Sequence, residues 1–329
     1  MNLLFFGDVH ITERDIPEIE GIFNEIMVIR QSYGANGIII TGDSFDSINP
    51  TSKELDFFST FLRKLNLPIK LLAANSHEST TPEESVLNHF GILHDNVFIC
   101  KDYADTNQLY VGHFGITESV LTRGGTVNKA DLAQYRSVVL GHFHNHEIIK
   151  PNIMQLGSVR YVDFGEDPSI GKKVAVCKDY GSKEPKWFII QLKSPYPMIS
   201  LKLCQYNDSM GSRDAIIEEK VSPAKPVPQI QGKFYVSVDT LRTALDKLDP
   251  KTKVRVIFED YDLYREFLPY STFYSQKFFL YKEKKNFVLD LGLDRTKNET
   301  ISLKDSLTKY LEINQIPEDI KQILLKEIK

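Results

Sequence analysis

The chain has 329 residues, of which 42% are hydrophobic and 26% are charged, and its formal net charge is -4. This length predicts one large domain followed by one or two smaller units. No apolar run reaches the roughly 18 residues that a membrane-spanning helix needs, so we expect no membrane association. The composition excludes a disordered chain and indicates a globular protein.

The charge is distributed unevenly along the chain. Residues 1–150 contain 11 Lys and Arg against 19 Asp and Glu, whereas the remainder contains 29 against 25. The acidic half could bind cations and the more basic half could contact phosphates. An ordinary scatter of surface charge explains the same counts equally well.

The cysteines and the first residues bear on the compartment. Cys100, Cys177 and Cys204 are odd in number and far apart, which suits buried thiols in a reducing compartment better than disulfides. The first eight residues lack the basic flank and the cleavage site of a signal peptide. We therefore expect a cytoplasmic protein.

The first half of the chain alternates short apolar runs with longer amphipathic stretches. Buried strands are predicted at residues 3–6, 37–40, 69–73, 97–100, 109–111 and 138–140. Residues 16–32 predict a helix, because Ile19, Ile22 and Ile26 recur at spacings of three and four. Two more strand-like runs, 173–177 and 187–192, follow. This pattern predicts a layered α/β domain over residues 1–195.

A second unit is predicted over residues 198–291. Strand-like runs at 234–238, 254–258, 278–281 and 287–291 surround a helical stretch that contains Leu241, Leu245 and Leu248. The proline-rich segment 221–232 suits a semi-rigid connection. Aromatic and charged residues alternate over 261–281, as on a nucleic-acid surface, although packing inside a core or sheet is the simpler explanation. We expect a small α+β domain.

Residues 296–329 predict two short helices at the end of the chain. Ser302 can cap the first, and Pro317 can open the second. Each has an apolar stripe, formed by Leu303, Leu307, Tyr310 and Leu311 in the first and by Ile320, Ile323, Leu324 and Ile328 in the second. Helices this short are marginal in isolation, so we expect them to pack against another surface.

Five polar clusters follow predicted strands, where an α/β sheet presents side chains to a ligand. They are Gly7-Asp8-Val9-His10, Gly42-Asp43-Ser44-Phe45-Asp46, Asn75-Ser76-His77-Glu78, Gly112-His113 and Gly141-His142-Phe143-His144. The Asp-x-His and His-x-His pairs put two side chains on one side of an extended segment. Imidazole and carboxylate donors together suit manganese, iron or zinc rather than calcium. Five of the eight histidines fall in these clusters, which favours a metal site over chance; His89, His94 and His146 receive no role.

The order of these clusters resembles the five signature motifs of the calcineurin-like metallophosphoesterases, over residues 7–144. The resemblance implies a layered β-sandwich flanked by helices and two divalent metal ions, with manganese preferred. It implies that one ion is held by Asp8, His10 and His144 and the second by His113 and His142. Asp43 would bridge both ions, and His77 would be the catalytic histidine beside the scissile phosphate.

The third motif departs from this family. The family has an asparagine immediately before the catalytic histidine, where its amide oxygen binds the second metal ion, and Ser76 occupies that position here. A hydroxyl is a poorer neutral donor than an amide carbonyl, so the second site could be weak. Asn75 could reach the metal instead if the loop shifts by one residue, and the sequence leaves both possibilities open.

Within this superfamily the chain is most similar to the SbcD-type nuclease subunits of bacterial and phage recombination complexes. The turn Gln155-Leu156-Gly157-Ser158 resembles the Gly-Ser turn of those nucleases, and the order of domains is similar. The resemblance implies a DNA exonuclease or endonuclease for repair or recombination, with a cap or DNA-binding domain at 198–291. If the chain comes from a phage, the expected location is the host cytoplasm. It also implies that helices in 296–329 bind an SbcC-like ATPase and that the protein forms a homodimer.

Two other functions stay open. One is a phosphatase or small-molecule phosphodiesterase of the same superfamily, although such an enzyme needs neither a cap nor a helical tail. The other is a metal-poor subunit that only scaffolds an ATPase on DNA, an alternative suggested by Ser76. Metal content and phosphodiester hydrolysis would separate this scaffold from either enzyme.

Overall fold

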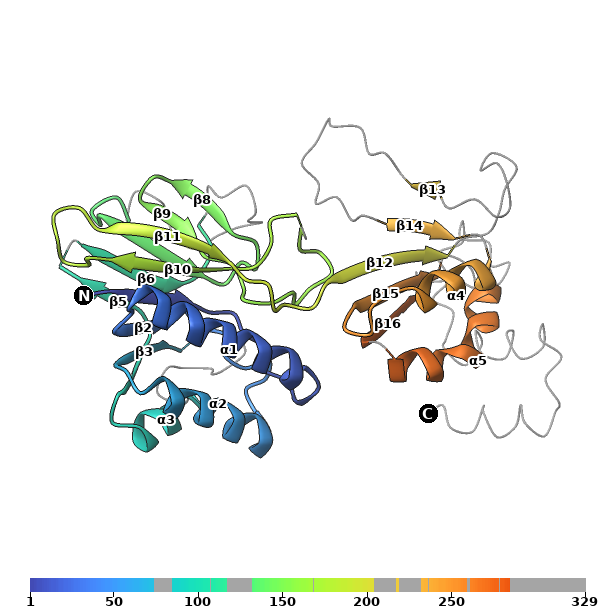
Figure 1. Ribbon diagram of the computed structural model, residues 1–329, viewed down its shortest axis with the longest axis horizontal. Helices are drawn as coiled ribbons and strands as arrows, with labels where there is room; N and C mark the ends of the chain where they lie inside the picture. Colours follow the sequence, from blue (N-terminus) through green and yellow to red (C-terminus); the bar gives the residue numbers. More distant parts are fainter. Residues whose placement is uncertain are drawn as a thin grey trace, which may run out of the picture.

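The computed structural model describes residues 1–73, 85–106, 108–116, 132–167, 169–203, 217–218, 232–235, 237–258, 261–277 and 279–284. Figure 1 shows two bodies that lie side by side and are joined through the segment before β12. The expected strand at 287–291, the expected helices in 296–329 and the motif at 75–78 lie outside the described residues. No helix in the described part is both long and apolar enough to cross a membrane.

The first body contains a sheet of mixed direction. Its strands are β1 (Leu3–Phe6), β2 (Gly37–Ile40), β3 (Ile69–Leu72), β4 (Val97–Cys100), β10 (Lys173–Lys178) and β11 (Lys186–Gln191). They lie in the order β11-β10-β1-β2-β3-β4. Strands β1 to β4 are parallel to one another, β10 is antiparallel to β1, and β11 is antiparallel to β10. All six strands were predicted from apolar runs, and the structure confirms them.

Both faces of the central strands β1 and β2 are buried, which explains their continuous apolar runs. Side chains alternate along a strand, so Leu4 and Phe6 point to one face of β1 and Leu3 and Phe5 to the other. Leu4 and Phe6 pack in the core beneath the helices, whereas Leu3 and Phe5 pack toward the second sheet. The sheet therefore lies between two hydrophobic layers.

Three helices and a short 3₁₀ turn belong to this body: η1 (Glu13–Asp15), α1 (Ile16–Tyr33), α2 (Ser52–Leu65) and α3 (Asn88–Leu93). The predicted helix at 16–32 is confirmed as α1. It ends at Gly34, whose left-handed backbone (φ 61°) is typical of a helix C-cap. Thr51 and Glu54 form a reciprocal capping box at the start of α2. Phe23 of α1 stacks on Phe61 of α2, which joins the two helices over the sheet.

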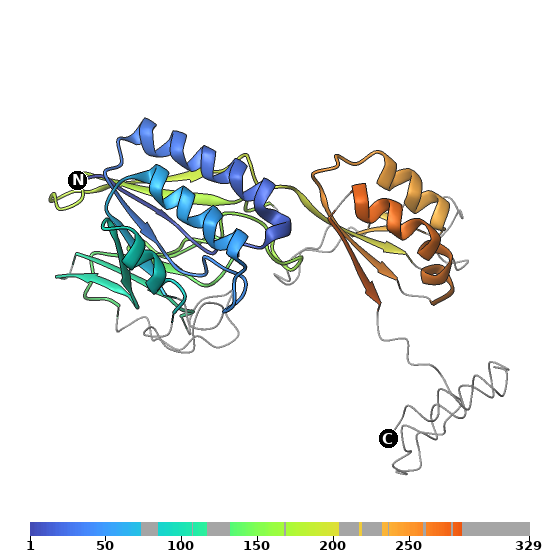
Figure 2. The same cartoon turned by 90° about the horizontal axis from the view of Figure 1, so that it is seen from below.

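A second sheet packs against the first. Its strands are β5 (Tyr103–Asp105), β6 (Leu109–His113), β7 (Ser137–Gly141), β8 (Glu147–Lys150) and β9 (Ile153–Gln155). They lie in the order β5-β6-β7-β9-β8, and β6 is parallel to β7. Leu109, Val111 and Val139 share a core with Phe5 and Ile39 of the first sheet. The first body is thus a sandwich of two sheets with α1 and α2 on the outer face of the first (Figures 1 and 2).

The second body corrects the expected α+β arrangement. Its elements are β12 (Met198–Leu203), β13 (Ile217–Glu218), β14 (Gly232–Tyr235), α4 (Val238–Asp246), β15 (Lys253–Phe258), α5 (Tyr261–Lys277) and β16 (Phe279–Lys284). From β14 to β16 strands and helices alternate along the chain, and β12, β14, β15 and β16 are parallel, whereas the short β13 is antiparallel to β14. Because a parallel pair needs a crossover connection, this body is α/β.

One local prediction in this body was also wrong. The strand predicted at 234–238 ends at Tyr235, because Ser237 caps α4 by accepting a hydrogen bond from the Thr240 amide. The aromatic run over 261–277 is the helix α5, and its buried residues Phe267 and Tyr274 pack on the sheet, which confirms core packing as the explanation of this run. Figure 2 shows α4 and α5 on the same side of the strands.

Candidate metal centre

The candidate ligands lie where strands of both sheets end. Asp8 and His10 follow β1, Asp43 follows β2, His113 is the last residue of β6, and His142 and His144 follow β7. The loops are joined by backbone hydrogen bonds, since the amides of Asp8 and His10 donate to the carbonyls of Gly42 and Asp43. The His142 amide donates to Oδ1 of Asp8 over 2.8 Å. These bonds bring the ends of the two sheets together at one place.

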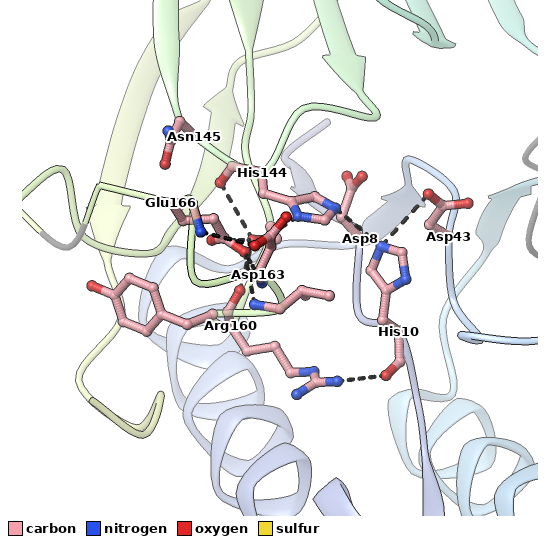
Figure 3. A network of polar contacts seen from close by, with 12 residues as sticks. Asp8, His10, Asp43, His144, Asn145, Arg160, Asp163 and Glu166 are labelled. Atoms are coloured by element: carbon pink, nitrogen blue, oxygen red, sulfur yellow. Dashed lines mark hydrogen bonds and ion pairs between the residues drawn. The ribbon is translucent and has the colours of Figure 1, made fainter. Parts of the chain in front are cut away.

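The six side chains form two adjacent groups. Asp8, His10 and His144 make the first, and Asp43, His113 and His142 make the second, with the donor atoms of each within 4.8 Å of one another. We call them the Asp8 group and the Asp43 group. Oδ2 of Asp43 lies 3.1 Å from Nε2 of His113 and 3.6 Å from Nε2 of His10. Asp43 therefore contacts both groups, and Figure 3 shows it beside His10.

The backbone at these positions is strained. Six non-glycine residues in the described part have a positive φ, and four are candidate ligands, namely Asp8 (49°), His10 (48°), Asp43 (45°) and His142 (93°). This region is disfavoured for residues with a Cβ atom. It persists only where the surroundings impose it, and it clusters at functional sites. The backbone strain and the sequence motifs therefore mark the same residues independently of each other.

Two glycines let the backbone approach His113 closely. Gly42 has a φ of 109°, and a Cβ atom there would lie 2.4 Å from Nδ1 of His113. A Cβ atom at Gly141 would lie 2.6 Å from the Thr41 carbonyl oxygen and 2.8 Å from the same ring nitrogen. Larger residues would displace the histidine, so the motifs require glycine at both positions.

Three histidines are oriented by acceptors at Nδ1. Nδ1 of His113 lies 2.7 Å from the Thr41 carbonyl oxygen. Nδ1 of His10 lies 3.2 Å from Oδ1 of Asp46, and Nδ1 of His144 lies 3.2 Å from Oε1 of Glu166. Carbonyl and carboxylate oxygens only accept, so Nδ1 carries the donated proton in each ring, and Nε2 is the ring nitrogen that faces the site.

The charges of the site favour a cation. Burial by itself would lower the pKa of His113, but its hydrogen bond to Asp43 and the charges of Asp8 and Asp43 outweigh burial and raise the pKa to about 9. The pKa of His142 is lowered, mainly by burial and then by the neighbouring His113. The carboxylates that stabilise a proton on His113 would likewise stabilise a metal cation.

Glu166 is a residue of the candidate site that the sequence did not mark. Its Oε1 accepts hydrogen bonds from the backbone amides of Val162 and Asp163 over 2.7 Å each, and its Oε2 pairs with Lys172. Burial would raise the pKa of Glu166, but the hydrogen bond from His144 and the charge of Lys172 outweigh burial and lower the pKa to about 2. Glu166 is therefore an ionised and fixed partner for His144 (Figure 3).

The donor set fits divalent cations. Oδ2 of Asp8 is buried and accepts no hydrogen bond from any residue that the structure describes, so it has unused capacity as a ligand. Imidazole nitrogens and carboxylate oxygens suit manganese, iron or zinc. Ser76, Asn75 and His77 lie outside the described residues. Their roles stay predictions, as do the individual ligand roles of the other six.

No family model matches the chain, and neither does any curated protein. Among solved structures, it is similar to the nuclease MPE of Pseudomonas putida, with 14% sequence identity and a TM-score of 0.31. The alignment covers 53% of this chain and 83% of that one. At this level the similarity supports no inference about fold or activity.

Proposed function

We propose that this protein is a metal-dependent nuclease that hydrolyses DNA phosphodiester bonds with two manganese ions. One observation carries the proposal: two groups of imidazole and carboxylate donors lie side by side, with Asp43 in contact with both. Two adjacent cations are the arrangement that many phosphoester-cleaving enzymes use. The resemblance of the ordered motifs to metallophosphoesterases supports the same class.

When bound, two divalent cations neutralise a phosphodiester and lower the pKa of water, so that hydroxide forms near neutral pH. The chain's own residues hold and orient these ions. Asp46, Thr41 and Glu166 direct Nε2 of three histidines toward the site. His77 would donate a hydrogen bond to the leaving oxygen, a role that general acids fill in such reactions.

Ser76 makes the second metal ion the weaker one in this proposal, because its hydroxyl replaces an amide oxygen. Ser76→Asn should tighten the second of two manganese-binding events in calorimetry while leaving the first unchanged. Two equal sites in the wild type, with no change in the variant, would show that Ser76 is not a ligand. Asn75 would then be the remaining candidate.

The partners belong to the same proposal. The SbcD-type resemblance and the presence of a second body favour DNA as the substrate and an SbcC-like ATPase as the partner, bound through helices in 296–329, with two copies in the assembly. Deleting residues 296–329 tests this. We expect a folded protein that keeps metal-dependent activity on simple phosphodiesters but no longer co-purifies with the ATPase. Partner binding that survives the deletion would place the interface elsewhere.

The test of function is digestion of end-labelled linear duplex DNA by the wild type and by Asp43→Ala, with and without manganese. Manganese-dependent cleavage by the wild type alone supports a nuclease. Hydrolysis of a phosphomonoester or of bis(p-nitrophenyl) phosphate without DNA cleavage would favour a phosphatase or small-molecule phosphodiesterase. Bound metal with no hydrolysis, or no metal at all, would favour a scaffold subunit.

A further inference from the structure

A buried group of four charges connects the second body to the metal centre. Asp15 ends η1 and Glu18 lies in the first turn of α1. Arg160 comes from the segment after the last histidine motif, and Lys253 is the first residue of β15. Each is at most 3% exposed. Two buried carboxylates face two buried cations, and the exposed Arg14 lies 3.6 Å from Oδ1 of Asp15. Loss of Lys253 would leave Arg160 as the one buried cation of this group.

Arg160 is the link to the metal centre. Its Nε donates to the Val9 carbonyl and its Nη2 to the His10 carbonyl, both over 2.7 Å, and Figure 3 shows the second bond. These carbonyls flank His10, whose backbone is left-handed. A strained segment needs such outside restraints to keep its geometry. The guanidinium fork supplies two of them at the residue that presents Nε2 to His144.

The carboxylates hold Arg160 in turn. Oδ2 of Asp15 lies 2.9 Å from Nη2 of Arg160. Oε2 of Glu18 lies 3.4 Å from Nη1 of Arg160 and 2.6 Å from Nζ of Lys253, so one oxygen is shared by the two cations. Without Lys253, the whole charge of Glu18 would act on the guanidinium and draw it away from the two carbonyls.

The contact between the bodies is specific at this point. Nζ of Lys253 also donates to the Tyr161 carbonyl over 2.8 Å. The linking segment is fixed on the same helix, because the Tyr196 amide donates to Oε1 of Glu18 and the Ser194 amide donates to Glu25. Lys253 therefore enters a prepared acceptor site on the first body.

We propose that Arg160 and Lys253 are positioning residues for the metal centre, so that the second body completes the scaffold of the Asp8 group. Lys253 balances Glu18, Glu18 and Asp15 direct Arg160, and Arg160 holds the Asp8–His10 segment. The inference rests on the proposed metal binding. It predicts that the charge of Lys253, a residue of the second body, affects the metal affinity of the Asp8 group and not that of the Asp43 group.

The test is calorimetric titration of manganese into full-length protein that carries His142→Ala, which leaves the Asp8 group as the intact site. In this background Lys253→Met and Arg160→Lys should each weaken manganese binding about tenfold or more, the usual effect of losing a partner behind a metal ligand. Arg160→Lys keeps the charge but loses the fork. Lys251→Met, which removes an equal charge from an exposed position two residues away, should leave the affinity unchanged.

A rescue variant separates positioning from stability. Glu18→Gln with Lys253→Met removes both opposite charges and should restore most of the affinity lost in Lys253→Met. Unchanged affinity in Arg160→Lys, or in a folded Lys253→Met with only a lower melting temperature, would overturn the inference. If Lys253→Met does not fold, the Arg160→Lys result decides. Wild-type protein that binds no manganese would instead overturn the proposed function, and this inference with it.

Discussion

The Nε2 atoms of His10 and His144 lie 3.2 Å apart, although 134 residues separate the two histidines in the sequence. Asp46 and Glu166 hold the Nδ1 atoms of the two rings, so both Nε2 atoms present lone pairs to the same space. Two acceptors at this distance repel each other unless a cation or a proton lies between them. In the proposed metal centre, a metal ion beside both atoms would remove this repulsion.

Glu166→Gln should weaken manganese binding at the Asp8 group by about 10-fold to 100-fold, the range seen when a partner behind a metal ligand is lost. The amide keeps the shape of the side chain but removes the charge that pairs with Lys172 and supports His144. Calorimetry measures the change. Glu184→Gln removes an equal charge from an exposed turn and serves as the control. Equal affinities in both variants would show that Glu166 has only a structural role.

Gly42→Ala should displace His113 and weaken the Asp43 group, because the new Cβ atom would lie 2.4 Å from Nδ1 of that histidine. The left-handed backbone adds a cost of about 1–3 kcal/mol. Gly181→Ala is a matched control, since Gly181 has a φ of 88° with no atom within 4 Å of the added Cβ. Urea unfolding and manganese titration of both variants check this. Metal binding that is equally affected in the two would contradict the close approach at His113.

His77→Ala should lower turnover by roughly 100-fold to 10,000-fold, the usual contribution of a general acid or base. In the proposed function His77 would lie beside the phosphate and would hold no metal ion, so the metal content should stay that of the wild type. Elemental analysis of the purified variant measures this together with its rate. Loss of a metal ion would show that His77 is a ligand.

Cys100 and Cys177 should react slowly with iodoacetamide near neutral pH. Burial raises the pKa of both thiols to about 11, so only about one in a thousand is a thiolate at pH 8. Because the shift is upward, the rate should increase about tenfold per pH unit from pH 8 to pH 10. Peptide mapping of a Cys204→Ser variant gives the two rates. Alkylation at pH 8 as fast as that of the unfolded chain would contradict this burial.

The sequence predicted those parts of the fold that depend on local pattern. Strands such as 3–6 and 37–40 are buried on both faces, so they stand out as unbroken apolar runs. The direction of strand pairing leaves no trace in a strand's periodicity, and for this reason the second body was expected to be α+β. The predicted strand 234–238 was too long, because an apolar residue such as Val238 fits the buried side of a strand or of a helix, and here it begins α4.

The candidate site divides in the same way. Asp8, His10, Asp43, His113, His142 and His144 could be found because glycine and strand ends mark them locally. Glu166, Arg160 and Lys253 could not, since each acts on a residue far away in the sequence; Arg160 and Glu18 are 142 positions apart. Asp46 was part of a recognised cluster, and its position three residues after Asp43 was the one available signal.

The most direct test of the metal centre is a calorimetric titration of manganese into metal-free wild type, Asp43→Ala and Asp179→Ala. Asp179 is an exposed residue with a φ of 57°, so its variant controls for placing alanine on a left-handed backbone. We predict two bound ions per chain in the wild type and in Asp179→Ala, and at least about tenfold weaker binding of both ions in Asp43→Ala, because one carboxylate serves both groups. Wild-type protein that binds fewer than two ions, or an Asp43→Ala variant that binds both as tightly as the wild type, would contradict a two-metal centre bridged by Asp43.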